Sequence, residues 1–197
     1  MIKNVIFDIG NVLLDFCWKD HIARFGFQGE KADRIAQAMM LGPIWPKLDL
    51  GLESDEDILE QFAHTPELEQ EIRLVFSDLS TIVREYEGSV DWIESLKARG
   101  YHTYYLSNYG ERIRREASKE LSFLSHMDGG IMSYTVHLAK PDPAIYQTLL
   151  DRYGLKAEEC VFLDDTVRNV EAAQALGIVG IVVTSQEQAK KELETLL

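Results

Sequence analysis

The sequence predicts an α/β fold with a mostly parallel sheet, helices on both faces and a small helical block inserted after the first strand. Apolar runs of strand length alternate with helical patterns along most of the chain, which is typical of βαβ units. The apolar runs are continuous, as in strands buried on both faces. Between residues 16 and 87 helical patterns take over. We therefore expect a core of residues 1–15 and 88–197 and a helical cap of residues 16–87.

The first strand, residues 3–8, ends in a carboxylate. Its apolar residues lead into Asp8, and the turn-prone pair Gly10-Asn11 follows after Ile9. In open α/β sheets, ligands bind beyond the carboxyl ends of the strands. Asp8 at such an end can be a nucleophile, a base or a metal ligand. Alternatively, Asp8 only caps the turn after the strand.

The cap has helical patterns and no convincing strand. Ser54 to Asp57 form a capping-box pattern, and Thr65-Pro66 marks another helix start. Apolar residues then recur at spacings of four and three from Leu68 to Ile82, which predicts one long helix. Because the block follows Asp8 directly, we expect a lid over the carboxyl edge of the sheet. The alternative is a helical region packed elsewhere on the core.

The strand and helix alternation resumes after the cap. We expect strands at residues 101–106, 131–133, 160–163 and 178–183. We expect helices from Ser89 to Gly100, at residues 111–120, from Pro143 to Gly154, up to Gly177, and after Ser185. Serine at a start and glycine at an end are common helix boundaries.

Composition narrows the function classes. The chain has 197 residues, 46% of them hydrophobic, and a formal net charge of −13. Such acidity disfavours binding to nucleic acid or anionic membranes, and no apolar run approaches membrane-spanning length. Cys17 and Cys160 lack zinc-type spacing, and we expect buried thiols in a reducing compartment. The first strand begins close to Met1, so we expect a cytoplasmic protein without a signal peptide. The oligomeric state is not predicted.

Polar residues stand at the ends of several predicted strands. They are Asp8, Ser107 with Asn108, and Asp164 with Asp165, while Lys140 precedes a helix that Pro143 opens. Parallel strands share a carboxyl edge, so we expect these groups to converge. Together they suit phosphoryl transfer, with an attacking carboxylate, donors for phosphoryl oxygens, a positive charge and oxygen ligands for Mg²⁺. Each residue alone is a weak signal: Ser107 and Asn108 could be ordinary turn residues, Lys140 could be solvated, and the pair Asp164-Asp165 could cap the next helix.

These motifs resemble the haloacid dehalogenase superfamily of hydrolases with a cap after the first strand. The matching stretches are Phe7 to Leu13, Leu106 to Asn108, Lys140 to Tyr146, and Phe162 to Asp165 followed by Asn169, Ala172 and Gly177. The sequence is most similar to the subgroup with Asp-x-Gly-Asn-Val, which includes phosphatases of glucose 1-phosphate. The resemblance implies a Rossmann-like core, Mg²⁺ and an aspartyl-phosphate intermediate.

The resemblance also implies site roles. Asp8 would be the nucleophile. The metal ligands would be Asp8, the Gly10 carbonyl and Asp165. Asp164 would either bind the metal directly or support the ligands from behind, and Asn169 would support the metal site. Phosphate would be held by Ser107, Asn108 and Lys140, the last of which would also neutralise Asp8.

Two positions depart from the family pattern. Gly10 stands where most related phosphatases have a second Asp that protonates the leaving group and activates water. A positioned acid or base contributes about 10²- to 10⁴-fold, and glycine cannot transfer a proton. Asp15 and His21 are ionisable and close in sequence, although we expect His21 to pack or face solvent. His137 stands where related sequences often have Gly, and we expect a loop residue rather than a cap contact.

We therefore expect a Mg²⁺-dependent phosphatase of a small phosphorylated metabolite, such as a sugar phosphate. One alternative is a metal-independent 2-haloacid dehalogenase, which the pair Asp164-Asp165 disfavours. Another is a regulatory protein that binds phosphorylated metabolites with weak turnover, which only Gly10 favours. Substrate specificity should come from the cap, where the candidate lining residues are Trp18, Trp45, Phe27 and His21. Aromatic residues in such helices more often belong to the core.

Overall fold

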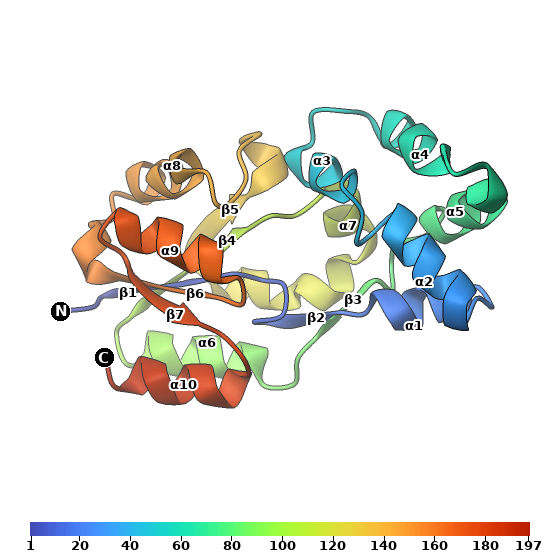
Figure 1. Cartoon of the computed structure of the whole chain (residues 1–197). Coiled ribbons are helices and arrows are strands. Elements are labelled where there is room, and N and C mark those ends of the chain that lie inside the picture. Colours follow the sequence, from blue (N-terminus) through green and yellow to red (C-terminus); the bar gives the residue numbers. More distant parts are fainter.

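Five parallel strands form the central sheet of the computed structural model, which describes residues 1–197. The strands are β1 (Asn4–Phe7), β4 (His102–Ser107), β5 (Gly129–Met132), β6 (Cys160–Asp164) and β7 (Val179–Val182). Their order is β5-β4-β1-β6-β7, with β1 in the middle. Because all five run in one direction, their carboxyl ends lie along one edge of the sheet (Figure 1). The α/β fold with a parallel sheet is confirmed.

Helices cover both faces of this sheet. One face carries α6 (Ser89–Ala98) and α10 (Gln186–Glu194), and the other carries α8 (Pro143–Tyr153) and α9 (Val167–Ala175) (Figure 1). Side chains alternate along β1: Val5 and Phe7 join the larger apolar cluster, whereas Ile6 joins the smaller one. Both faces of the strand are thus buried, which explains its uninterrupted apolar sequence.

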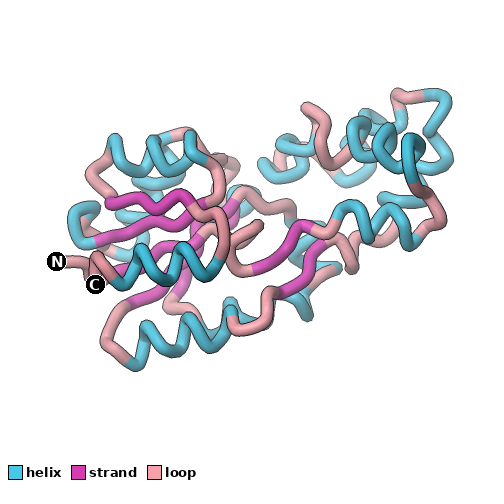
Figure 2. The backbone as a smooth tube through the Cα atoms, turned by 60° about the horizontal axis from the view of Figure 1, so that its bottom comes forward, coloured by secondary structure: helices cyan, strands magenta, loops and turns pink.

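The cap segment stands to one side of the sheet and is attached by two strands. β2 (Leu14–Phe16) and β3 (Val83–Glu85) pair antiparallel, so the chain enters and leaves the cap segment at one place. Between them lie α1 (Trp18–Arg24), α2 (Gly29–Ala38), α3 (Trp45–Leu50), α4 (Asp55–Ala63), the 3₁₀ turn η1 (Pro66–Leu68) and α5 (Glu69–Phe76). Both termini lie on the far side of the sheet (Figures 1 and 2). The division into core and cap domains itself stays a prediction.

Two local expectations about the cap segment were wrong. The long helix through Ile82 ends at Phe76 as α5, and the segment expected to lack strands contains β3. Leu79 and Ile82 are fully buried, so their spacing reports burial rather than helix. A turn in which Asp78 accepts from the Ser80 amide (2.9 Å) separates α5 from β3.

Ser89 does not cap α6. Gly88 occupies the cap position, and the Ser89 hydroxyl donates to the carbonyl oxygen of Leu13 at 2.7 Å. This hydrogen bond ties the start of α6 to the segment after Asp8. Ser54 and Ser185 do cap their helices, accepting from the amides of Asp57 and Gln188 at 3.1 Å each.

Other helices start and end close to their expected limits. α8 runs from Pro143 to Tyr153 and is closed by left-handed Gly154. The expected helix at residues 111–120 is shorter: α7 (Glu111–Glu116) is followed by the 3₁₀ helix η2 (Ser118–His126). The remaining 3₁₀ turns are η3 (Ser133–Thr135) and η4 (Ala157–Glu159). None of the helices has the length and apolar character needed to cross a bilayer.

Candidate active site

The structure brings the polar strand ends together at the carboxyl edge of the sheet. Asp8 follows β1 directly, Ser107 ends β4 and Asp164 ends β6. The ammonium of Lys140, from the loop before α8, lies 2.9 Å from Oδ1 of Asp8 and 2.6 Å from Oδ2 of Asp164. The Lys140 and Asp164 side chains are at most 1% exposed. A buried cation therefore links two strand-end carboxylates.

Asn108 holds the loop that carries Lys140. Its side-chain amide donates to the Lys140 carbonyl oxygen (3.0 Å), and its side-chain oxygen accepts from the Lys140 amide (2.8 Å). Both polar ends of Asn108 are thus used on one backbone unit. The resemblance assigns Asn108 to binding phosphoryl oxygens. In the structure its side chain supports Lys140, and it also lines a cavity.

Burial and charge act against each other in this cluster. The net pKa of Asp8 is raised to about 7: burial is the largest cause of the rise, the Lys140 ammonium opposes it, and Asp164 adds to it. Burial lowers the pKa of Lys140, but the attraction of Asp8 and Asp164 outweighs this effect and the net shift is upward. Lys140 is therefore charged at neutral pH, and its charge favours the ionised form of Asp8.

Three carboxylates could hold a metal ion. Oxygens of Asp8, Asp164 and Asp165 lie within 4.8 Å of one another. Asp164 uses both oxygens on protein donors: Lys140, the Thr166 amide (2.7 Å) and the side chain of Asn169 (3.1 Å). Asp8 and Asp165 line the cavity, whereas Asp164 does not. The donor set thus faces the cavity with Asp8 and Asp165 and is backed by Asp164.

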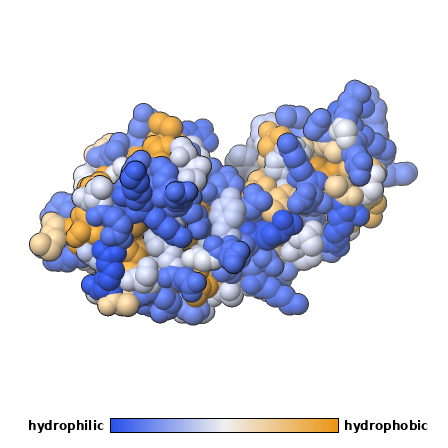
Figure 3. All heavy atoms as spheres, turned by 90° about the horizontal axis from the view of Figure 1, so that it is seen from below, coloured by the Kyte–Doolittle hydropathy of each residue, from blue (hydrophilic) through white to orange (hydrophobic).

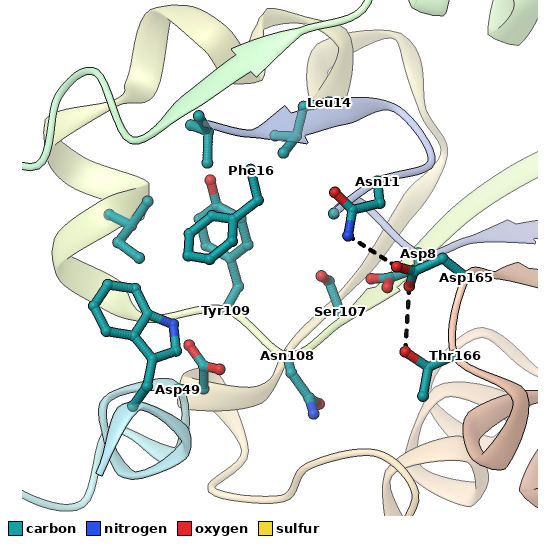
Figure 4. Close-up of a pocket in the computed structure, with 14 residues that line it drawn as sticks. Asp8, Asn11, Leu14, Phe16, Asp49, Ser107, Asn108, Tyr109, Asp165 and Thr166 are labelled. Atoms are coloured by element: carbon teal, nitrogen blue, oxygen red, sulfur yellow. Dashed lines mark hydrogen bonds between the residues drawn. The ribbon is translucent and has the colours of Figure 1, made fainter. Parts of the chain in front are cut away.

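The chemistry of this donor set fits a hard divalent cation. All its donors are oxygens, which Mg²⁺ and Ca²⁺ prefer. Lys140 neutralises only part of the negative charge of the three carboxylates. Asn11 adopts a left-handed backbone (φ 55°) and donates from its side chain to Asp165 Oδ2 at 2.8 Å. This turn presents Gly10 and Asn11 to the same cavity (Figure 4).

A cavity of about 210 Å³ opens in front of the carboxylate cluster, with the polar groups at one end. Its other end is apolar and is lined by Leu14, Phe16, Trp45, Val83, Tyr109 and Ile113. These residues come from β2, β3, α3, α7 and the segment after β4. The cavity is therefore bounded jointly by the cap segment and the core.

Of the four cap residues expected to line the pocket, only Trp45 does so. The ring of Trp18 packs under Lys19, and that of Phe27 packs under Lys31. His21 is fully buried, with its ring nitrogens 3.0 Å from Thr81 Oγ1 and 3.2 Å from the Val75 carbonyl oxygen. Burial lowers the pKa of His21, which is consistent with a neutral core histidine.

Asp49 is a cavity residue that the sequence reasoning missed. It lies in the short helix α3, between Leu48 and Leu50, and not at the end of a strand. A carboxylate between two apolar residues was the only signal in the sequence. The Asp49 side chain makes no hydrogen bond or ion pair with the protein, and it lies across Ser107 and Asn108 from Asp8 (Figure 4).

The core holds the end of α3 through two side chains. The Ser133 hydroxyl donates to the Asp49 carbonyl oxygen (2.5 Å) and accepts from the Tyr109 amide (2.9 Å). Nδ1 of His137 donates to the carbonyl oxygen of Leu50 (2.9 Å). The expectation that His137 would not contact the cap was wrong, because its left-handed backbone (φ 55°) turns the ring toward α3.

Comparison with known proteins places the chain in a family. The model of the haloacid dehalogenase-like hydrolases matches residues 2–177. Acyl-CoA dehydrogenase family member 10 of Mus musculus is 31% identical, over 99% of this chain and 19% of its own length. The chain thus spans about a fifth of that relative.

One further relative and one solved structure match almost over their whole length. Sesquiterpene phosphatase astK of Aspergillus oryzae is 26% identical, over 99% of this chain and 96% of its own. A haloacid dehalogenase family enzyme from Bacteroides thetaiotaomicron, solved with magnesium and inorganic phosphate, has the same fold: its TM-score is 0.72, its identity 22%, and the match covers 94% of this chain and 96% of that one. By its family match, this chain belongs to the haloacid dehalogenase-like hydrolases.

Proposed function

We propose that the protein is a Mg²⁺-dependent phosphatase of a small phosphorylated metabolite that forms an aspartyl-phosphate on Asp8. The observation that carries the proposal is the contact of Asp8 with buried Lys140, beside a cluster of carboxylates, at the polar end of a cavity. The Bacteroides enzyme of the same fold was solved with magnesium and inorganic phosphate, and the Aspergillus relative is a phosphatase. Both support the same chemistry here.

Each side chain has a distinct task in this proposal. Asp8 attacks phosphorus, and Lys140 offsets the negative charge of the transferring group. The Ser107 hydroxyl donates to a phosphoryl oxygen, and Asn108 keeps Lys140 in place. Mg²⁺, when bound, neutralises phosphoryl charge. Asp8, Asp165 and the Gly10 carbonyl would hold this ion, with Asp164 and Asn169 behind them.

Hydrolysis of p-nitrophenyl phosphate tests the proposal directly. We expect turnover with Mg²⁺ and its loss in EDTA. Asp8→Asn should fold, because the amide is isosteric and Lys140 keeps Asp164 as a partner, but activity should fall by at least about 10³-fold because the nucleophile is gone. Asp33→Asn, the same change on the exposed surface of α2, is the matched control. Full activity in EDTA or in Asp8→Asn would contradict the mechanism.

The apolar end of the cavity narrows the substrate class. The leaving group would lie against Phe16, Trp45 and their apolar neighbours, so we propose an alcohol with an apolar face. A sugar phosphate meets this requirement through the C–H face of its ring. Trp45→Ala should change the ratio of kcat/KM values between sugar phosphates and p-nitrophenyl phosphate. Trp18→Ala, outside the cavity, should leave the ratio unchanged.

The two other functions give different outcomes in simple assays. A 2-haloacid dehalogenase would release halide from 2-chloropropionate in the presence of EDTA. A regulatory protein would bind phosphorylated metabolites and hydrolyse none of them at a useful rate. The cavity-facing carboxylates Asp8 and Asp165 favour the phosphatase, because halide displacement needs no metal site.

A further inference from the structure

The position two residues after the nucleophile carries no proton-transferring group. Gly10 lines the cavity but has no side chain, and the two ionisable residues close in sequence do not reach the site. Asp15 lies on β2 outside the cavity, and its Oδ2 is 3.2 Å from the Cys17 sulfur. His21 is buried, and its ring forms hydrogen bonds with Thr81 and Val75. A phosphatase built on Asp8 therefore needs an acid and base from elsewhere in the chain.

Asp49 is the one cavity carboxylate that the protein itself leaves unpaired. Asp8 contacts Lys140, and Asp165 contacts Asn11, whereas no protein donor reaches Asp49. Its backbone is nevertheless well held. Ser133 bonds the Asp49 carbonyl oxygen to the segment after β4, and His137 bonds the next carbonyl. The main chain is anchored while the carboxyl group faces the space that the leaving group would occupy.

The glycine after Asp49 supports this anchoring. Gly51 has a left-handed backbone (φ 63°), and a Cβ atom there would lie 2.9 Å from the Cβ of Tyr134. The end of α3 can therefore approach η3 closely only with glycine at this position. Three separate contacts thus set the height of Asp49 above the carboxyl edge of the sheet.

We propose that Asp49, on the cap segment, is the general acid and base of the proposed phosphatase reaction, in the role that Gly10 cannot fill. Asp8 forms a bond to phosphorus as the ester P–O bond breaks, and the released oxygen takes its proton from the Asp49 carboxyl group. The alcohol departs. Water then attacks the aspartyl-phosphate and gives a proton to the Asp49 carboxylate, the Asp8–phosphorus bond breaks, and phosphate leaves. Both side chains return to their starting states.

The electrostatics of the cavity suit this role. The net pKa of the Asp49 carboxyl is raised to about 7, mainly by burial and further by repulsion from Asp8, while the Lys140 ammonium opposes the rise. A group with a pKa near the working pH can both donate and accept a proton efficiently. Tyr109, which faces Asp49 from the segment after β4, stays neutral because burial raises its pKa above the usual range. From η3 only the Ser133 hydroxyl bonds to Asp49, and from the loop beyond it His137 bonds to the neighbouring carbonyl.

A pair of substrates of similar size separates proton donation from the rest of catalysis. Benzyl phosphate releases an alkoxide that needs a proton, whereas p-nitrophenyl phosphate releases a stable anion. In Asp49→Asn, kcat/KM for benzyl phosphate should fall by about 10²- to 10⁴-fold, and that for p-nitrophenyl phosphate by much less. The variant should also show a burst of nitrophenolate and accumulate phosphorylated protein in the mass spectrum, because water attack has lost its base. Asp33→Asn should behave as the parent protein.

A measurement on the unaltered protein keeps the proposal open to refutation if Asp49→Asn folds poorly, and a double variant adds a second test if it folds well. In the unaltered protein, kcat/KM for benzyl phosphate should decline above pH 7, where Asp49 loses its proton, while that for p-nitrophenyl phosphate should not. In the Asp49→Asn background, Gly10→Asp should recover benzyl phosphate turnover, because a Cβ atom at Gly10 meets no atom within 4 Å. Identical pH profiles for both substrates, or equal losses in Asp49→Asn without a burst, would overturn the role of Asp49. Absence of any hydrolysis by the unaltered protein would instead refute the phosphatase itself.

Discussion

Lys140 shows how one buried side chain can decide both stability and chemistry. Its ammonium contacts Asp8 and Asp164, and its backbone is held by Asn108. Two carboxylates that would repel each other in a dry interior are thereby kept at the same sheet edge. Removal of one partner from a buried ion pair leaves the other charge without compensation, which is costly.

Lys140→Met should lower the free energy of unfolding by about 3–5 kcal/mol at pH 7. Because the net pKa shift of Lys140 is upward from 10.5, this contribution is fully present below pH 10.5 and is lost as the pH rises through the folded-state value. Urea unfolding at pH 7 measures the loss. Lys156→Met, at an exposed position, should change stability by less than about 0.5 kcal/mol. Equal effects of the two substitutions would contradict the buried ion-pair cluster.

Asp49 should contribute least to the stability of the fold at pH values at which its carboxyl group is ionised. Its pKa rises from 3.8 to about 7 on folding, so its contribution to stability is present below pH 3.8 and is lost as the pH rises through 7. Asp49→Asn does not titrate. The variant should therefore gain stability relative to the parent between pH 4 and pH 7, reaching about 0.5–2 kcal/mol at pH 8. Thermal unfolding at pH 4 and pH 8 tests this, and a pH-independent difference would show that folding does not raise the pKa of Asp49.

At the scale of elements, the contact between α3 and η3 positions the cap residues that line the cavity. Ser133 is fully buried and joins α3 to the segment after β4 through one hydroxyl group. The antiparallel pair β2–β3 tethers the cap segment at its other end. The cavity therefore depends on two attachments that are far apart in the sequence.

Ser133→Ala should lower the free energy of unfolding by about 1–3 kcal/mol, because the Asp49 carbonyl and the Tyr109 amide each lose a buried partner. Benzyl phosphate turnover should fall more than p-nitrophenyl phosphate turnover if Asp49 loses its position. Thr135→Ala is the matched control: its hydroxyl bonds only to Met132, three residues before it, at 2.7 Å. An unchanged ratio of benzyl phosphate to p-nitrophenyl phosphate turnover in Ser133→Ala would contradict this role of Ser133.

At the scale of the whole molecule, charge opposes the proposed substrate. The formal net charge is −13, and the face shown in Figure 3 is mostly hydrophilic, with apolar residues in small separate patches. A phosphate ester approaches against this field and is attracted only near Lys140 and the bound cation. Salt shortens the range of the repulsion, with a Debye length of about 10 Å at 0.1 M.

We therefore expect kcat/KM for phosphate esters to rise about twofold to tenfold between 10 mM and 150 mM NaCl. The double variant Glu30→Gln with Glu187→Gln, exposed on α2 and α10, reduces the negative charge away from the site. It should raise kcat/KM at low salt and have little effect at high salt. A fall of kcat/KM with added salt would show that local attraction dominates instead.

The sequence by itself determined the sheet, its strand ends and most of the groups placed there. Continuous apolar runs predict buried parallel strands, and the direction of such strands brings Asp8, Ser107, Lys140 and Asp164 to one edge. Local rules also sufficed for the caps at Ser54 and Ser185 and for the end of α8 at Gly154.

Only the tertiary structure decided how the cap segment completes the site. Asp49 meets Ser133 across 84 residues, and His137 meets Leu50 across 87. Trp45 lines the cavity while Trp18 does not, and Leu79 and Ile82 are buried outside any helix. Apolar spacing reports that a side chain is buried but not what it is buried against. Which face of α3 turns toward Asp8 is set by the docking of distant segments, so it became visible only once the chain was folded.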